Sequence, residues 1–283
     1  PSSHFQDIFS RCLLCGACED NCSRQLPILD RIVQARSTFS HLYGRHPLQK
    51  VAARMVLSRP ALLEGLVMAG LSLARLSLLP ADSGLRIKLG LLEKKEKEGQ
   101  GRRNQETPGR VPDGLGINYF SGCMARYLQP SIGRATVRLA EAATGGIPHE
   151  PDSQVCCGLA AWSAGKIEEA RKLARKNIEV FAQTPGAILT SCASCSSHLT
   201  KYPALFEDDP VWLEKAEAFS ARVQEFTSFA DAGLPAELFA ADPSCRVYYH
   251  EPCHLRFDRM HSCLLYTSPS PRDRTRSRMP SSA

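Results

Sequence analysis

Four cysteines lie close together near the start of the chain: Cys12, Cys15, Cys18 and Cys22. Their C-x2-C-x2-C-x3-C spacing is one in which thiolates bind an iron–sulfur cluster. Two-residue gaps let thiolates converge from one tight turn, and Gly16 lets that turn direct backbone N–H groups at an anionic cluster. The C-x3-C step is expected to place Cys22 at the start of a helix. The spacing predicts a [4Fe-4S] cluster, with a zinc knuckle or plain buried cysteines as the alternatives.

The same run departs from the bacterial ferredoxin pattern in two ways. Ser23 follows the last cysteine, where that pattern has proline. In two-cluster ferredoxins, moreover, the fourth cysteine of a run is a ligand of the other cluster and not of its own. Cys22 would then serve a partner cluster whose own cysteines are missing before Cys12. Because the chain begins with Pro1, we expect an N-terminal truncation that removed a second run.

A second group of cysteines is spread over the middle of the chain: Cys123, Cys156, Cys157, Cys192 and Cys195. Adjacent side chains on a regular helix or strand point apart. The vicinal pair can therefore reach one metal centre only from an irregular turn, for which Gly158 supplies the freedom. The group predicts a second metal site, with structural cysteines or a redox disulfide as the alternatives.

Histidines and one further cysteine lie near these groups in the sequence: His198, His250, His254 and Cys253. A single histidine is more often structural than a ligand, so the histidines are secondary candidates. Cys253 follows a short aromatic strand, as Cys123 does. This echo predicts that Cys253 is the first metal ligand of a second copy of the same module.

The elements that must position the second group alternate between strands and helices. Short apolar runs predict strands at 117–120, 187–190 and 247–250. Amphipathic periodicity predicts helices at 131–143, 165–183 and 212–230. Such alternation indicates a layered α/β domain. Cys123 and Cys192 then follow strand ends, at the edge of the sheet where ligands collect, and Cys195 enters a helix whose N-terminus favours an anionic cluster.

Composition divides the chain into five parts. A helical 4Fe-4S domain, a charged linker rich in Gly and Pro, and the α/β domain are expected at residues 1–93, 94–115 and 116–245. A second α/β copy begins at 246–258 but is truncated, since too few residues follow to complete it. The tail, 259–283, is rich in Ser, Pro and Arg and resembles a translated sequencing-adapter sequence; a native disordered basic tail is the alternative.

Charge and hydropathy exclude some kinds of partner. The tail carries most of the formal net charge of +6, so we expect no nucleic-acid binding. Glu64 and Arg75 interrupt the most apolar stretch, 62–79, which predicts a buried helix and not a membrane span. Contact with a partner subunit or with a membrane surface is the alternative for this stretch. Thiolate ligands require a reducing compartment, so we expect a cytoplasmic location, with attachment to the inner face of the plasma membrane as an option.

Together these motifs resemble the CCG, or cysteine-rich, domain of heterodisulfide reductase subunits B and D and of iron–sulfur subunits of glycolate and lactate oxidation. The order of parts is most similar to the glycolate oxidase iron–sulfur subunit, and residues 249–255 resemble the opening of that family's second copy. The resemblance implies an α/β CCG (cysteine-rich) domain preceded by a small α-helical ferredoxin-like [4Fe-4S] domain. It also implies that the second group holds another iron–sulfur cluster, non-cubane or cubane, with zinc as the alternative.

The same resemblance implies a function. An FAD-containing dehydrogenase subunit would oxidise a 2-hydroxy acid such as glycolate or lactate, and this subunit would relay the electrons towards quinone. The sequence has no GxGxxG loop, P-loop or Ser–His–Asp arrangement, which agrees with an oxidoreductase subunit that does not bind the organic substrate itself. Two alternatives remain: a CCG cluster that reduces disulfides, and a zinc-stabilised scaffold without redox chemistry.

Overall fold

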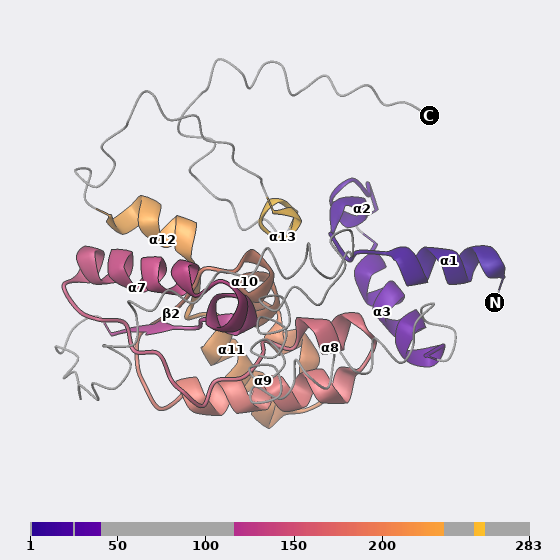
Figure 1. Cartoon of the computed structure of the whole chain (residues 1–283). Coiled ribbons are helices and arrows are strands. Elements are labelled where there is room, and N and C mark those ends of the chain that lie inside the picture. Colours follow the sequence, from indigo (N-terminus) through magenta and orange to yellow (C-terminus); the bar gives the residue numbers. More distant parts are fainter. Residues whose placement is uncertain (1, 25, 41–115, 235–251, 258–283) are drawn as a thin grey trace, which may run out of the picture.

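The structure is a computed structural model and describes residues 2–24, 26–40, 116–234 and 252–257 (Figure 1). Four of the expected features lie outside the described residues: the buried helix at 62–79, the linker at 94–115, the strand at 247–250 and the tail at 259–283.

Three short strands form a parallel sheet in the order β1-β2-β3: β1 (Ile117–Tyr119), β2 (Ala187–Thr190) and β3 (Val223–Glu225). In this register Asn118, Ile188 and Val223 lie in one row across the sheet. Parallel neighbours need crossover connections, which helices provide here. The strands predicted at 117–120 and 187–190 are confirmed, the first one residue shorter than expected.

Helices lie on both sides of the sheet. On one side of β2 lie α7 (Pro130–Thr144) and α12 (Phe226–Gly233), and on the other α9 (Ile167–Phe181) and α11 (Pro210–Ser220) (Figure 1). Four shorter helices carry or follow the cysteines: η2, a π-helix (Met124–Leu128), α8 (Leu159–Ser163), α10 (Ala193–Thr200) and η3, a 3-10 helix (Tyr202–Leu205). The predicted α/β class is confirmed for this region.

The single helix predicted at 212–230 is wrong: the segment forms most of α11, then β3, then the start of α12. Arg222 gives the physical reason for the break. Its guanidinium donates hydrogen bonds of 2.9, 2.6 and 2.7 Å to the carbonyl oxygens of Phe181, Thr184 and Gly186. These contacts hold the segment beside the start of β2, where the next residues pair as a strand. Pairing with β2 overrides a helical periodicity that is local to the sequence.

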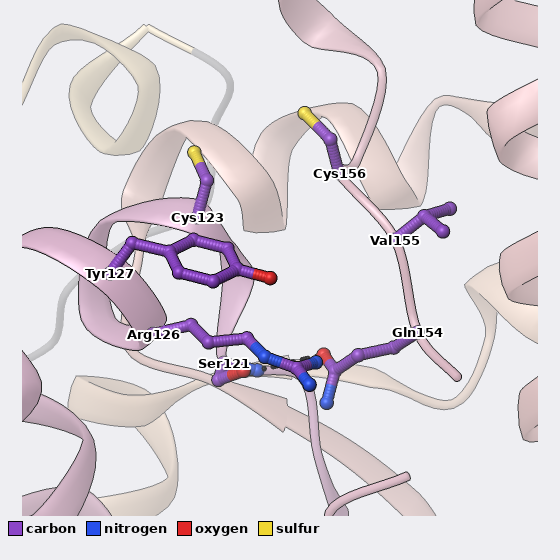
Figure 2. Close-up of a pocket in the computed structure, with 8 residues that line it drawn as sticks. Ser121, Cys123, Arg126, Tyr127, Gln154, Val155 and Cys156 are labelled. Atoms are coloured by element: carbon purple, nitrogen blue, oxygen red, sulfur yellow. Dashed lines mark hydrogen bonds between the residues drawn. The ribbon is translucent and has the colours of Figure 1, made fainter. Parts of the chain in front are cut away.

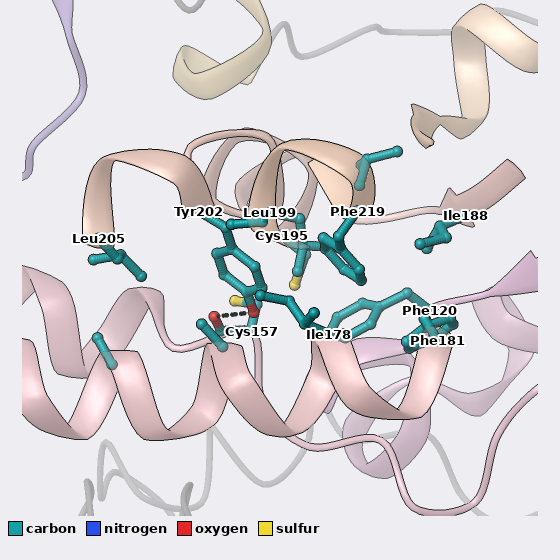
Figure 3. Packing of buried hydrophobic residues seen from close by; sticks show 14 of the residues in the cluster. Phe120, Cys157, Ile178, Phe181, Ile188, Cys195, Leu199, Tyr202, Leu205 and Phe219 are labelled. Atoms are coloured by element: carbon teal, nitrogen blue, oxygen red, sulfur yellow. Dashed lines mark hydrogen bonds between the residues drawn. The ribbon is translucent and has the colours of Figure 1, made fainter. Parts of the chain in front are cut away.

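A hydrophobic core fills the space between the sheet and the α9–α11 side (Figure 3). The ring centroids of Phe181 and Phe219 lie 6.0 Å apart, and those of Tyr202 and Phe219 lie 5.3 Å apart. Cys157 and Cys195 belong to the same cluster and are only 5% and 4% exposed. Two of the predicted ligands therefore lie in the core, where close packing fixes their backbone.

The first cysteine run belongs to a small helical unit made of α1 (Ser3–Arg11), α2 (Ala17–Asp20) and α3 (Ile28–Thr38). Its buried residues form a second hydrophobic cluster: Phe9, Leu14, Leu29, Ile32 and Val33. Trp162 and Ile167, from the region of α8 and α9, pack against this cluster. The helical unit is thus in direct contact with the α/β domain.

Arg36 fastens this contact. Although buried, its guanidinium donates hydrogen bonds to the carbonyl oxygens of Phe9 at 2.8 Å, Cys12 at 2.5 Å and Ser163 at 2.7 Å. These carbonyls lie at the C-terminal ends of α1 and α8, where helices leave carbonyl groups unpaired and carry partial negative charge. One cation from α3 therefore satisfies acceptors on both sides of the contact.

A last short helix, α13 (Cys253–Arg256), packs against α10. Within the described ranges, no helix has the length and apolar character needed to cross a bilayer.

Candidate metal centre

The five cysteines of the second group come together from separate segments: Cys123 precedes η2, Cys156 and Cys157 precede α8, Cys192 caps α10 and Cys195 lies within it. Side-chain hydrogen bonds link them in the order Cys123, Cys156, Cys157, Cys195 and Cys192. Figure 2 shows the thiols of Cys123 and Cys156 pointing to the same side, and Figure 3 shows those of Cys157 and Cys195 inside the core. The convergence that the spacing predicted is present in the fold.

These contacts make the thiols differ in acidity. A hydrogen bond with Cys156, followed by burial, raises the pKa of Cys123. A bond with Cys123 lowers the pKa of Cys156, but the bond with Cys157 and burial outweigh it and raise this pKa to about 12. Bonds with Cys156 and Cys195 lower the pKa of Cys157, while those with Cys157 and Cys192 raise the pKa of Cys195. The bond with Cys195 lowers the pKa of Cys192 to about 6, against the effect of burial.

The alternation has a chemical consequence. The pKa shifts of Cys157 and Cys192 favour the thiolate, while hydrogen bonds from neighbouring cysteines and burial shift the pKa of Cys123 and Cys195 towards the protonated thiol. A bound cationic centre would supply the compensating charge and displace the remaining protons. The donor set therefore fits a thiolate-bound metal or cluster. Among the described residues no group of three or more His, Cys, Asp or Glu side chains is already arranged around a single metal ion.

The vicinal pair sits on the irregular turn that the sequence predicted. Gly158 has φ +94°, in the left-handed region, and begins α8. Asn177 of α9 supports the turn by accepting a hydrogen bond from the N–H of Val155 at 2.9 Å and donating one to the carbonyl of Cys156 at 3.1 Å. Asn177 also donates to the hydroxyl of Tyr202, which is 3.1 Å away and in turn donates to the carbonyl of Cys157 at 2.8 Å (Figure 3).

Sequence reasoning missed both supporting side chains. Asn177 and Tyr202 are fully buried and touch the backbone of the cysteine turn, not its thiols. The available signal was a polar residue on the apolar face of the helix, since Asn177 lies three and seven positions after Ala174 and Ala170. A buried amide needs partners, and here the partners are the turn's backbone groups.

The loop that carries Cys123 is tied to the same turn. The carboxamide oxygen of buried Gln154 accepts a hydrogen bond from the N–H of Ser121 at 3.1 Å (Figure 2). Gly122 has φ +64°, and a Cβ at this position would lie 3.1 Å from the Sγ of Cys195. The backbone therefore approaches a thiol more closely than most side chains allow.

A small open pocket lies beside the thiols of Cys123 and Cys156 (Figure 2). Arg126 contributes positive charge to its lining and donates hydrogen bonds of 3.3 Å to the carbonyl of Asp152. Tyr127 lines the same pocket. On this side Cys123 and Cys156 are partly exposed, whereas Cys157 and Cys195 are buried.

The histidine candidates differ in their surroundings. His198 is buried, and burial, then the charges of Lys201 and His254, lower its pKa to about 3. Its Nε2 would lie 3.5 Å from a Cβ at Gly158, beside the vicinal pair, and has no hydrogen-bond partner among the described residues. His254 uses both ring nitrogens elsewhere, near Ser194 and Leu14. His250 lies outside the described residues.

The first cysteine run is more open. Cys12 caps the end of α1, and its Sγ accepts a hydrogen bond of 3.4 Å from the N–H of Leu14. Cys15 lies in the loop and is half-buried, and Cys18 lies on α2 and is exposed. Gly16 begins α2 with φ +88°, in agreement with the predicted turn.

One expectation about this run is wrong. Cys22 does not start a helix, because α2 ends at Asp20 and α3 begins only at Ile28. Cys253, the candidate first ligand of the next copy, is exposed at the start of α13.

Comparison with known proteins agrees with this geometry. Residues 117–200, which contain the whole five-cysteine group, match the family model of the cysteine-rich domain. The chain is 37% identical over 140 residues (49% of this chain, 57% of the relative) to lactate utilization protein A of Exiguobacterium sp.. It is 32% identical over 139 residues (49% and 58%) to the protein of the same name from Bacillus subtilis.

A third relative, lactate utilization protein A of Shouchella clausii, is 33% identical over 141 residues (50% of this chain, 58% of the relative). The chain thus spans little more than half the length of the curated relatives it matches. No solved structure matches it. The chain therefore carries a cysteine-rich domain and is distantly similar to lactate utilization proteins, while the resemblance to a glycolate oxidase subunit stays a prediction.

Proposed function

We propose that this chain is an iron–sulfur electron-transfer subunit of a system that oxidises a 2-hydroxy acid, lactate or glycolate. The observation that supports it best is the convergence of five cysteines, from segments far apart in sequence, beside one hydrophobic core. Similarity to lactate utilization proteins supports the choice of substrate class.

The five-cysteine group is proposed to hold a cluster, non-cubane or cubane. A bound iron–sulfur cluster supplies one-electron redox chemistry. The chain's own contribution is to orient and shield the ligands. Backbone N–H groups of Leu159 and Ser194, at the starts of α8 and α10, hydrogen-bond to the thiols of Cys157 and Cys192 and favour their thiolates. Asn177 holds the backbone of the vicinal pair, and the core shields Cys157 from water.

The first run is proposed to hold a [4Fe-4S] cluster through Cys12, Cys15, Cys18 and Cys22. Exposure of Cys18 supports a position where a partner protein can approach. The proposed partners are an FAD-containing dehydrogenase subunit on the donor side and quinone at the membrane surface on the acceptor side. The thiolate ligands favour a reducing compartment. The proposed location is the cytoplasm, with attachment to the inner face of the plasma membrane as an option.

The pocket beside Cys123 and Cys156 favours a second candidate function, reduction of a disulfide by the cysteine-rich centre. Cys123 and Cys156 are partly exposed on this side, and the guanidinium of Arg126 lies beside them in the pocket lining. Here the disulfide would gain two electrons and two protons to give two thiols, and the electrons would come from the flavoprotein partner.

The test uses the full-length chain purified without oxygen. Iron and acid-labile sulfide together, an electron paramagnetic resonance signal after dithionite reduction, and reoxidation by a short-chain quinone would support the relay. Zinc without iron or sulfide would contradict it and favour the scaffold alternative. Steady release of thiols from a small disulfide, with no reaction towards the quinone, would contradict the relay and favour disulfide reduction.

A further inference from the structure

One side chain joins the two cysteine-bearing regions. The Nδ1 of His254 lies 2.9 Å from the Oγ of Ser194, and its Nε2 lies 3.3 Å from the carbonyl oxygen of Leu14. Leu14 and His254 are 240 positions apart in sequence. Figure 1 shows the helix that carries this histidine, α13, between α10 and α2.

The two partners of His254 occupy equivalent positions. Leu14 is the second residue between Cys12 and Cys15, and Ser194 is the second residue between Cys192 and Cys195. The imidazole therefore contacts the inside of a C-x2-C segment on each side. A shift of either segment would move two candidate ligands at once.

The chemistry of the partners fixes the roles of the ring atoms. A carbonyl oxygen only accepts, so Nε2 must carry the proton and donate to Leu14. In the neutral imidazole Nδ1 then accepts, and the hydroxyl of Ser194 donates to it. Both hydrogen bonds can thus form at once without a charged ring.

Packing around α13 supports the same arrangement. Leu255 is buried, and a Cβ at Gly16, in the turn of the first run, would lie 3.0 Å from the Cβ of Phe257. Leu14 has φ +54°, a left-handed conformation that is costly for a leucine and persists only where surrounding contacts hold it. The bond from His254 is one such contact.

The geometry points to His254 as a positioning residue that couples the two cysteine sites. By holding both C-x2-C segments through one ring, it fixes their separation, on which the rate of electron passage between two redox centres depends. This role deepens the proposed function and rests on it, but the bridge itself can be tested without a cluster.

The test measures amide hydrogen exchange in the full-length chain with His254→Leu. Two sets of hydrogen-bonded amides report on the two sides: Glu19 and Asp20 in the first run, and Ser196 in α10. We expect exchange to accelerate about fivefold or more on both sides, as the loss of a hydrogen bond on each side allows. The matched control is His149→Asn, an exposed histidine, which should change neither side.

Two further variants remove one bond each. In His254→Asn the side-chain carboxamide lies near the position of Nδ1, so amide exchange in α10 should stay at its wild-type rate. In His254→Gln the carboxamide lies near the position of Nε2, so exchange in the first run should stay at its wild-type rate. Acceleration on one side only, or on neither, in His254→Leu would overturn the bridge. Iron and sulfide measured in the same samples decide the proposed function separately, since exchange responds to the bridge with or without bound iron.

Discussion

Asn177 illustrates how a single buried amide can organise a ligand turn at the residue scale. It pairs with the N–H of Val155, the carbonyl of Cys156 and the hydroxyl of Tyr202. Asn177 and Tyr202 are fully buried and the backbone groups of Val155 and Cys156 are part-buried, so each lost bond leaves a shielded polar group without its partner. The amide thus controls the backbone on which two candidate ligands sit.

We predict that Asn177→Ala lowers the free energy of unfolding by about 3 kcal/mol, because several buried groups lose their partner together. Chemical denaturation of the full chain measures this. Asn21→Ala is the control: its side chain is exposed and donates to the carbonyl of Ala17 at 2.7 Å, so its effect should stay within about 0.5 kcal/mol. Equal effects of the two variants would contradict the role of Asn177.

Sequence reasoning at this scale found the cysteines but not what supports them. Spacing alone brought out Cys123 and the vicinal pair, because ligand motifs are read directly from the chain. Tyr202 and Gln154 act through backbone groups of distant segments, and no local pattern encodes such contacts. The supporting residues therefore became visible only with the fold.

Among the secondary-structure elements, the start of α8 after the vicinal cysteines depends on a glycine. Gly158 begins α8 with φ +94°, whereas Gly133 lies inside α7, where a Cβ would make ordinary contacts of 3.7 Å. We predict that Gly158→Ala costs about 1–2 kcal/mol, the penalty of a left-handed conformation for an L-residue. Gly133→Ala should instead stabilise the chain by about 0.5–1 kcal/mol.

Thermal and chemical unfolding of the two variants, measured side by side, test whether Gly158→Ala lowers the free energy of unfolding while Gly133→Ala raises it. A Gly158→Ala chain as stable as the wild type would show that the turn can relax, and would remove the argument for a rigid vicinal pair.

The predicted elements succeeded where periodicity and local burial agree. Strands at 117–120 and 187–190 and the amphipathic helices at 131–143 and 165–183 all exist within a few residues. The failure at 212–230 comes from a short strand without a local signal, since its pairing partner lies more than thirty residues earlier. Hydrogen bonds to segments distant in sequence determine the structure of residues 221–225.

In the molecule as a whole, the contact between the helical unit and the α/β domain fixes how the two parts are placed. Gly165 lies at this contact, and a Cβ there would be 2.4 Å from the backbone nitrogen of Ser37 in α3. Its φ is +75°, close to the +72° of Gly145, where nothing lies within 4 Å of a Cβ. Replacing either glycine by alanine strains a left-handed backbone, but only the Cβ at position 165 would also clash with α3.

We predict that Gly165→Ala loosens the helical unit, while Gly145→Ala costs only its left-handed backbone penalty of about 1–2 kcal/mol and leaves the contact intact. Trp162 packs against the buried clusters on both sides of the contact and reports on it. Its fluorescence should shift to longer wavelength in Gly165→Ala, as water reaches the indole, and stay unchanged in Gly145→Ala. Identical spectra for both variants would mean that the contact tolerates the added methyl group.

Sequence patterns gave no sign of this contact. Composition separates the two parts by a charged linker at 94–115, and the groups that Arg36 and Gly165 approach are backbone atoms. Contacts with backbone atoms do not depend on the type of the contacted residue, so the sequence does not reveal them. Only the fold shows that both cysteine regions belong to one assembled body.

The iron and sulfide content of Cys157→Ser, compared with the wild-type chain and with Cys245→Ser, tests most directly whether the five cysteines form one iron–sulfur site. Cys245 lies outside both cysteine groups and serves as the control. We expect Cys157→Ser to lose the iron, sulfide and paramagnetic signal of one site and to keep those of the first run, while Cys245→Ser loses nothing. Wild-type iron and sulfide in Cys157→Ser would contradict it.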